Sequence, residues 1–309
     1  MKKTITIGIP RALLYYRYNI LWKTFLEKLG LKVVISPETT KNILEEGINY
    51  SIDESCLSSK VFMGHISYLR GKTDYIFIPR IASYGKDDIT CTKFHGLFDI
   101  VKNTFPDINL IEYDLDVNNG KTEFIGFMKL GLNFTKNIFK IYMAYRTAKK
   151  SQAEYERHEN MKQQELLKKQ GLKILVVSHS YNIYDEFIGQ PVIKYLNKLK
   201  VIPLFADLAD REYSKNAAMR FSYSLYWTYN KELIGSIDYY KEKIDGIIFL
   251  VSFPCGPDSL VTEICQRKIK DIPFITIVMD ELQGEAGLRT RLESFIDIIS
   301  MKKQEEKII

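Results

Sequence analysis

The feature that most constrains this fold is an alternation of short β-branched runs with longer amphipathic segments, and it occurs twice along the chain. In the first third, the expected strands are residues 4–9, 32–36, 74–79 and 108–113. From residue 172 the pattern restarts, with expected strands at 173–178, 201–205, 247–251 and 274–279. Such alternation is typical of βαβ units around a parallel sheet. We therefore predict two α/β domains, each Rossmann-like (flavodoxin-like), with the carboxyl ends of their strands facing a shared cleft.

The segments between the expected strands carry helical periodicity. Expected helices cover residues 13–29, 54–68, 184–199, 216–243, 258–269 and 288–300, and a further helix starts at Thr39 or Thr40. Residues 126–169 have an apolar-periodic first half and then a run rich in Lys, Glu, Gln and Arg, which indicates one or two long helices with a solvated second half. A packed surface helix is favoured over a coiled-coil partner site because no heptad seam is sustained. The predicted division is an N-terminal domain at 1–125, a helical connector at 126–171 and a C-terminal domain at 172–309.

Composition excludes several classes of protein. Apolar residues make up 46% of the 309 residues and charged residues 27%, which is typical of a folded globular protein. No run approaches the roughly 18 apolar residues that cross a bilayer, and no signal-peptide pattern follows Met1, so we expect a cytoplasmic protein without a membrane partner. The net charge of +6 is spread along the chain without a basic tract, which argues against nucleic acid as a partner.

The chain has four cysteines, which are Cys56, Cys91, Cys255 and Cys265. They are too few for a disulfide-built scaffold of this size, and reduced thiols are expected. Cys255 lies between an apolar strand and a helix start, where helix-terminal N–H groups favour a thiolate. Cys56 and Cys91 also have loop or helix-start contexts, whereas Cys265 lies within a helix. Any one of these cysteines alone is best explained as an inert buried thiol, but three on predicted cleft loops together indicate a metal centre.

Acidic and histidine side chains on the same loops are candidates for proton transfer. The candidate catalytic residues are Glu54, His179, Glu281 and Glu285, with His65 and Asp258 as further possibilities. A structural histidine is the favoured explanation for His65 and His179, and helix capping or ion pairing explains each carboxylate at least as well. Arg11 and Arg80 could bind an anionic group such as a CoA phosphate, or they could be structural. Phosphate-loop, dinucleotide and serine-hydrolase motifs are missing, so we expect neither ATP hydrolysis nor hydrolase chemistry from this chain.

Seven short motifs, in order along the chain, carry a resemblance to a known family. They are the run from Ile7 to Leu13, the run from Asp53 to Cys56, the run from Asp74 to Arg80, the run from Tyr181 to Glu186, Tyr226-Trp227-Thr228, the run from Cys255 to Ser259, and Asp280-Glu281 with the run from Gly284 to Gly287. With these motifs the sequence resembles the acyl-CoA dehydratase activase-related proteins, a domain family of unknown function. That family is related to the iron–sulfur subunits of 2-hydroxyacyl-CoA dehydratases and benzoyl-CoA reductases. The resemblance covers nearly the whole chain.

The resemblance implies a cofactor and a ligand set. In the related dehydratases three cysteines hold a [4Fe–4S] cluster and leave one iron open to a substrate oxygen or water. That role is implied for Cys56, Cys91 and Cys255, and none is implied for Cys265; a larger cluster shared between subunits stays open. One departure is the stretch Leu57-Ser58-Ser59, where the family pattern implies a proline after the cysteine and leucine.

Three functions are compatible with these observations. The first is an oxygen-sensitive, anaerobic iron–sulfur component of a 2-hydroxyacyl-CoA dehydratase-like lyase or reductase, which receives low-potential electrons from a separate ATPase activase. The second is a non-catalytic electron relay or accessory subunit that works with a homologous second subunit or as a homodimer. The third is a metal-free α/β protein that binds a small ligand. The substrate stays open in each case.

Overall fold

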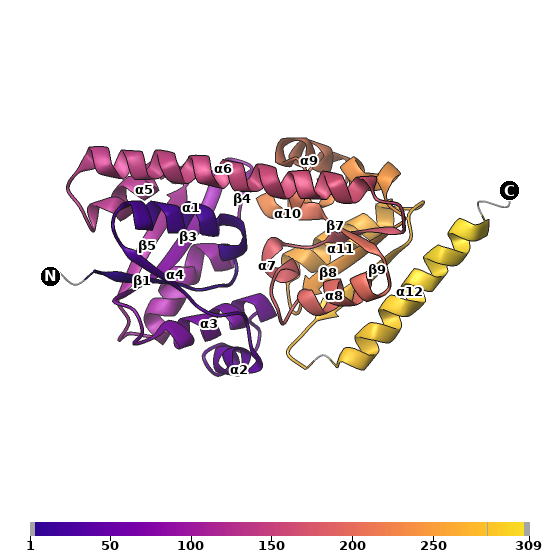
Figure 1. Ribbon diagram of the computed structural model, residues 1–309, viewed down its shortest axis with the longest axis horizontal. Helices are drawn as coiled ribbons and strands as arrows, with labels where there is room; N and C mark the ends of the chain where they lie inside the picture. Colours follow the sequence, from indigo (N-terminus) through magenta and orange to yellow (C-terminus); the bar gives the residue numbers. More distant parts are fainter. Residues whose placement is uncertain (1–3, 283, 306–309) are drawn as a thin grey trace. The chain divides into compact units, whose positions relative to one another are not determined.

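The computed structural model describes residues 4–282 and 284–305, and it divides into two compact units (Figure 1). Unit 1 comprises Met1–Arg157 with Tyr226–Thr228, and unit 2 comprises His158–Leu225 with Tyr229–Ile309. Each unit contains one sheet whose main strands are parallel and whose faces are covered by helices. The predicted fold class, two Rossmann-like α/β domains, is confirmed.

The sheet of unit 1 has four parallel strands and one short antiparallel strand. The strands are β1 (Thr6–Ile9), β2 (Lys32–Ile35), β3 (Tyr75–Gly85), β4 (Asp88–Ile89) and β5 (Leu110–Asp116). The parallel order is β2-β1-β3-β5, in which Ile7 lies opposite Val33 of β2 and Tyr75 of β3. β3 is longer than predicted because it continues along β5 and then turns back into β4. The prediction missed this hairpin because Arg80 and Tyr84 interrupt the apolar run.

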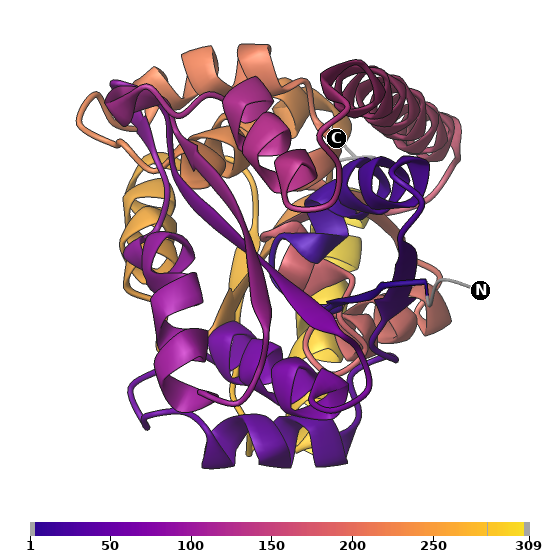
Figure 2. The ribbon, with the colours of Figure 1, turned by 90° about the vertical axis from the view of Figure 1, so that its left-hand side faces the viewer.

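Helices cover both faces of this sheet (Figures 1 and 2). They are α1 (Tyr15–Lys28), α2 (Lys41–Asn49), α3 (Leu57–Leu69), α4 (Thr92–Thr104), α5 (Glu123–Leu132) and the first part of α6 (Ile138–Lys168). As predicted for one alternative, Thr40 caps α2, where its side chain accepts the N–H of Ile43. The core contains packed aromatic rings among aliphatic side chains; the rings of Trp22 and Phe77 are 5.1 Å apart. The apolar periodicity of the helices is therefore explained by burial against the sheet.

Helices α2 and α3 pack with their backbones in direct contact. A Cβ atom on Gly47 would lie 1.9 Å from the carbonyl oxygen of Lys60, and one on Gly64 would lie 1.8 Å from that of Ile43. No side chain fits at such a distance, so both positions require glycine. This contact fixes the position of α3, whose first turn follows Cys56.

Unit 2 repeats the strand order of unit 1. Its strands are β6 (Lys173–Val177), β7 (Ile202–Phe205), β8 (Gly246–Ser252) and β9 (Phe274–Met279), all parallel, in the order β7-β6-β8-β9. The central strand β8 is buried at every residue, which explains its continuous apolar sequence. In both units the order reverses between the first and third strands, so the loops that follow these two strands lie side by side.

Two helices of unit 2 are broken where the periodicity predicted one. The helices are α7 (Ser180–Ile183), α8 (Gln190–Lys198), α9 (Arg211–Ala217), α10 (Thr228–Tyr240), α11 (Gly256–Lys268) and α12 (Glu285–Glu305). The prediction of a helix at 184–199 was wrong at its start, because Asp185 Oδ1 accepts the N–H groups of Phe187 and Ile188 and forms a turn. The predicted helix at 216–243 is also interrupted, since a non-helical stretch at 221–227 separates α9 from α10.

The long α6 is held by buried amides in its polar half. Gln152 accepts the N–H of Leu21 (3.1 Å) and donates to the carbonyl of Arg17 (2.9 Å) in unit 1. Gln163 donates to the carbonyl of Phe205 in unit 2 (2.6 Å). The expected solvation of this half is therefore wrong at these two positions. None of the helices in the described part of the chain is both long and apolar enough to span a membrane.

Candidate functional site

Three of the four cysteines occupy the same local position, the residue that precedes a helix. Cys56, Cys91 and Cys255 are the N-cap residues of α3, α4 and α11, and all three are half-buried thiols. Their carbonyls accept the first helical hydrogen bonds, from Ser59, Phe94 and Ser259 at 2.8, 2.9 and 3.0 Å. A thiol at this position lies near the N–H groups at the positive end of a helix, which favours the thiolate.

In unit 1 the helix starts that carry Cys56 and Cys91 are tied together. Lys93, in the first turn of α4, donates from Nζ to Oγ of Ser55, which is buried and precedes Cys56 (3.3 Å). Thr90, the residue before Cys91, is anchored to β3 because its N–H donates to the carbonyl of Ala82 (2.9 Å). An ammonium group between two thiol-bearing helix starts adds positive charge where thiolates would form.

In unit 2 Cys255 belongs to a buried polar cluster at the carboxyl ends of β6 and β8. We call Cys255, Asp258, His179 and Asn230 the Asp258 cluster. His179 Nε2 and Asn230 Nδ2 each lie 2.8 Å from Asp258 Oδ1, and the Cys255 side chain also hydrogen-bonds Asp258. Burial alone would raise the pKa of Asp258, but the charge of His179 and the hydrogen bonds from His179, Asn230 and Cys255 hold that pKa below its ordinary value. Asp258 is therefore an ionised acceptor shared by three donors.

The side chains behind this cluster fix its geometry. The His179 ring stacks on Tyr181 with centroids 4.8 Å apart and an interplanar angle of 15°. Ser252 donates to Asn182 Oδ1 (2.8 Å), and Asn182 Nδ2 donates to Ser178 Oγ (3.2 Å). These contacts link the end of β8 to the segment that follows β6, which contains His179.

The structure thus brings three of the residues considered from the sequence together, and it adds one. His179, Asp258 and Cys255 meet in one cluster, although they are separated by up to 79 residues in the sequence. Asn230 was missed, because it lies in an interval that the periodicity assigned to one continuous helix. The sequence offers one weak indication of Asn230, which is that a side-chain amide lies near the start of the helix before the third strand.

The remaining acidic candidates have more exposed positions. Glu54 is exposed in the turn that precedes Cys56. Glu285 is the first residue of α12 and pairs with Arg289 one turn later (2.6 Å), which is the ion pairing that the sequence left as an alternative. Glu281 is half-buried in the turn after β9. His65 lies in unit 1, where it contacts Thr39.

The donor chemistry of the three N-cap cysteines fits an iron–sulfur cluster. Thiolates are the ligands such clusters require, and a half-buried thiol at a helix start can lose its proton and be reached. Cys265 does not fit, because burial raises the pKa of its thiol to about 12. Cys56 and Cys91 belong to unit 1 and Cys255 to unit 2. Among the residues that the structure describes, no group of three or more His, Cys, Asp or Glu side chains is placed to hold a metal ion.

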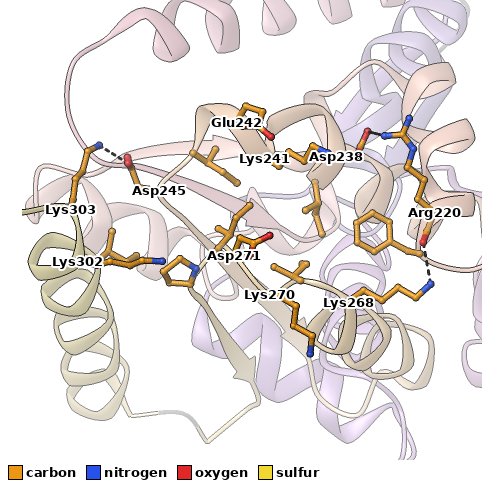
Figure 3. A pocket seen from close by; sticks show the side chains of 17 residues that line it. Arg220, Asp238, Lys241, Glu242, Asp245, Lys268, Lys270, Asp271, Lys302 and Lys303 are labelled. Atoms are coloured by element: carbon orange, nitrogen blue, oxygen red, sulfur yellow. Dashed lines mark hydrogen bonds and ion pairs between the residues drawn. The ribbon is translucent and has the colours of Figure 1, made fainter. Parts of the chain in front are cut away.

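A cavity of about 640 Å³ lies at the other end of the unit 2 sheet, beside the residues that precede β8 and β9 (Figure 3). Six cationic and four acidic side chains line it, and several are already paired: Asp238 with Arg220 (2.5 Å) and Lys241 (3.2 Å), and Asp245 with Lys303 (2.5 Å). Lys268 and Lys302 lie in the last turns of α11 and α12, where a cation stabilises a helix end. Ion pairs and helix ends therefore explain much of this charge, and none of the residues that line the cavity belongs to the Asp258 cluster.

Comparison with known proteins gives one family match. The model of the family described as "CoA enzyme activase uncharacterised domain" matches residues 6–208. No curated protein matches the chain. A solved structure entitled "Crystal structure of ZnuA" is 12% identical and aligns over 96% of this chain and 99% of that chain, with a TM-score of 0.27, which is too low to support any inference.

Proposed function

Because the chain belongs to the CoA enzyme activase uncharacterised domain family, we propose that it is an iron–sulfur component of an ATP-activated, low-potential dehydratase or reductase system. The ligands in this proposal are Cys56, Cys91 and Cys255. The observation that carries it is the shared N-cap position of these three thiols, which the fourth cysteine lacks. The proposed cluster is [4Fe–4S], and its partners are a separate ATPase activase and a homologous second subunit or a second copy of this chain.

Such a cluster, when bound, supplies an iron that can bind and polarise a substrate oxygen. The residues of the chain contribute access and electrostatics. The N–H groups at the starts of α3, α4 and α11 stabilise negative charge on sulfur, and Lys93 adds a cation near two of the three ligands. Asp258 holds the start of α11 through Cys255 and is itself held by His179 and Asn230. These residues position the proposed ligand. Cys255 gives up the proton that it donates to Asp258 when it binds iron as a thiolate, and Asp258 then keeps His179 and Asn230 as its donors.

The test is anaerobic reconstitution of the full chain with iron and sulfide, followed by metal and sulfide analysis and electron paramagnetic resonance. We expect bound iron in the wild-type chain and a loss of at least half of it in Cys56→Ala, Cys91→Ala and Cys255→Ala. Cys265→Ala is the matched control and should keep its iron, because this thiol is buried in α11. A colourless wild-type protein without iron, or equal iron loss in all four variants, would contradict the proposal.

The same preparation separates a catalytic cluster from an electron relay. If one iron is open to substrate, adding acyl-CoA thioesters to the reduced chain should change its resonance spectrum. A spectrum that changes only after a second subunit is added would assign this chain the accessory role.

A further inference from the structure

Unit 1 holds a second polar cluster, away from the cysteine-bearing helix starts, at the carboxyl ends of β1 and β2. Arg11 is the second residue after β1, and its N–H donates to Oγ of Ser36, the first residue after β2 (2.8 Å). His65 comes from the middle of α3, and its Nε2 lies 3.0 Å from Thr39 Oγ1. The charge of Arg11 contributes to lowering the pKa of His65, which places the guanidinium within electrostatic range of the ring. We call Arg11, Thr39 and His65 the Arg11 cluster.

The Arg11 cluster contains two buried polar atoms without a partner. Within the described residues, neither Arg11 Nε nor His65 Nδ1 has a hydrogen-bond partner, and both atoms are buried. The His65 side chain as a whole is completely buried. Buried donors are nearly always satisfied in folded proteins, since an unmade hydrogen bond is costly. Two such atoms at one site call for an acceptor that this chain does not itself supply.

The protonation state of His65 makes it a neutral donor. Burial, with a further contribution from the charge of Arg11, lowers the pKa of His65 to about 3, so its ring carries a single proton at neutral pH. When the Thr39 hydroxyl donates to Nε2, that proton resides on Nδ1. The ring then offers an N–H group and no charge, beside a guanidinium that provides the charge.

One side of this cluster, the loop after β1, borders the position where parallel sheets bind ligands. The strand order reverses between β1 and β3, and the loop after β1 lies at this point. Leu13 in the same loop has φ of 50°, a left-handed conformation that branched residues rarely adopt and that is concentrated at functional sites.

Arg11 is more available than the other candidate arginine. Arg80 forms two bonds with Asp99 (2.7 and 3.1 Å) and one with the carbonyl of His95 (2.9 Å). Within the part of the chain that the structure describes, the Arg11 side chain forms one hydrogen bond, from Nη2 to Glu38 at 3.2 Å, and the Glu38 side chain is 57% exposed. Its Nε–H group, which is buried, has no hydrogen-bond partner within the described residues.

We propose that the Arg11 cluster binds an oxyanion, a carboxylate or phosphate group of a small ligand, through Arg11 Nε–H and His65 Nδ1–H. Thr39 sets the histidine tautomer by donating to Nε2, and Ser36 holds the backbone of Arg11. The site needs no metal, so it can fail or hold independently of the proposed cluster.

The probes are inorganic phosphate and acetate, titrated into the full chain at an ionic strength held constant with sodium chloride. We expect saturable heat by calorimetry with at least one of them, and at least tenfold weaker binding in Arg11→Gln. The control is Arg70→Gln, which removes an exposed arginine of the same unit that pairs with Asp107, and its affinity should match that of the wild type. Phosphate binding alone identifies a phosphate site, acetate binding alone a carboxylate site, and binding of neither overturns the proposal.

Two further measurements test the proposal even if Arg11→Gln does not fold. Nitrogen-15 spectra of wild-type His65 should show the proton on Nδ1 and a shift of that nitrogen when the anion is added. His65→Asn keeps an amide donor near the position of Nδ1, whereas His65→Gln places its amide near Nε2, so Asn should retain more affinity than Gln. A proton on Nε2, or equal binding by wild type and Arg11→Gln, would refute the assignment.

Discussion

The two units share a strand order but use the corresponding positions differently. Arg11 is the second residue after the first strand of unit 1, and His179 is the second residue after the first strand of unit 2. In unit 2 His179 finds a buried carboxylate, Asp258, whose donors are all accounted for by the chain. In unit 1 the charge of Arg11 acts on the neutral His65, and within the described residues each of the two has a buried atom without a hydrogen-bond partner. The fold determines where polar side chains gather, and the residues decide whether the site is closed or can receive a ligand.

The cysteines show the same pattern of shared position and different use. Cys91 and Cys255 each cap the helix that follows the third strand of their unit. Cys56 caps α3, the helix before the third strand, and the matching helix of unit 2, α10, begins at Thr228 without a cysteine. The proposed ligands are therefore two from unit 1 and one from unit 2.

At neutral pH, removing Asp258 should have the largest effect, and that effect should be confined to unit 2. In Asp258→Ala, His179, Asn230 and Cys255 lose a common buried acceptor, and we expect unfolding to cost about 3 kcal/mol less. Hydrogen exchange measured by mass spectrometry should show the loss over β8 and α11. Asp99→Ala is the control, because it breaks an ion pair at an exposed carboxylate and should cost at most about 1 kcal/mol. Equal effects of the two variants would mean that the Asp258 cluster is not a stabilising unit.

Acid should weaken unit 1 first, through His65. Burial, and secondarily the charge of Arg11, lowers the pKa of His65 from 6.5 to about 3. Below pH 6.5 the unfolded chain therefore binds a proton at His65, whereas the folded chain keeps this ring neutral until the pH approaches 3. The contribution of neutral His65 to the free energy of unfolding is therefore complete above pH 6.5. It decreases towards pH 3 by about 1.4 kcal/mol per pH unit. Asp258, with a pKa lowered from 3.8, begins to lose its contribution only at lower pH.

Tryptophan fluorescence during urea unfolding reports the stability of unit 1 at each pH. Trp22 and Trp227 are the two tryptophans of the chain, and both belong to unit 1. The urea concentration at the midpoint of unfolding should decrease when the pH is lowered from 7 to 4.5 in the wild type. It should decrease less in His65→Asn. An identical pH dependence of the two proteins would show that His65 is not the group responsible.

The sequence was sufficient where local pattern and burial agree. Continuous apolar runs predicted all four strands of unit 2, and the helix-start contexts of Cys56 and Cys255 match the N-caps observed. What escaped prediction depends on contacts between distant residues. Asn230 could not be singled out from the sequence because its role depends on a hydrogen bond to the distant Asp258. Gln152 and Gln163 lie in a polar run that predicts solvent exposure, and only their backbone partners show that they are buried. Likewise, only the three-dimensional structure shows that Arg11 Nε and His65 Nδ1 are buried without a hydrogen-bond partner among the described residues.

The smallest effects should come from the exposed carboxylates that each unit places near a helix start, Glu54 in unit 1 and Glu285 in unit 2. Glu285 has a side chain that is 76% exposed, and its pairing with Arg289 is a pair within one helix. We expect Glu285→Gln and Glu54→Gln each to change the free energy of unfolding by less than about 0.5 kcal/mol. Iron content after reconstitution should also stay at the wild-type value in both. If either variant loses iron while its stability is unchanged, that carboxylate acts at the metal centre and is more than an exposed surface group.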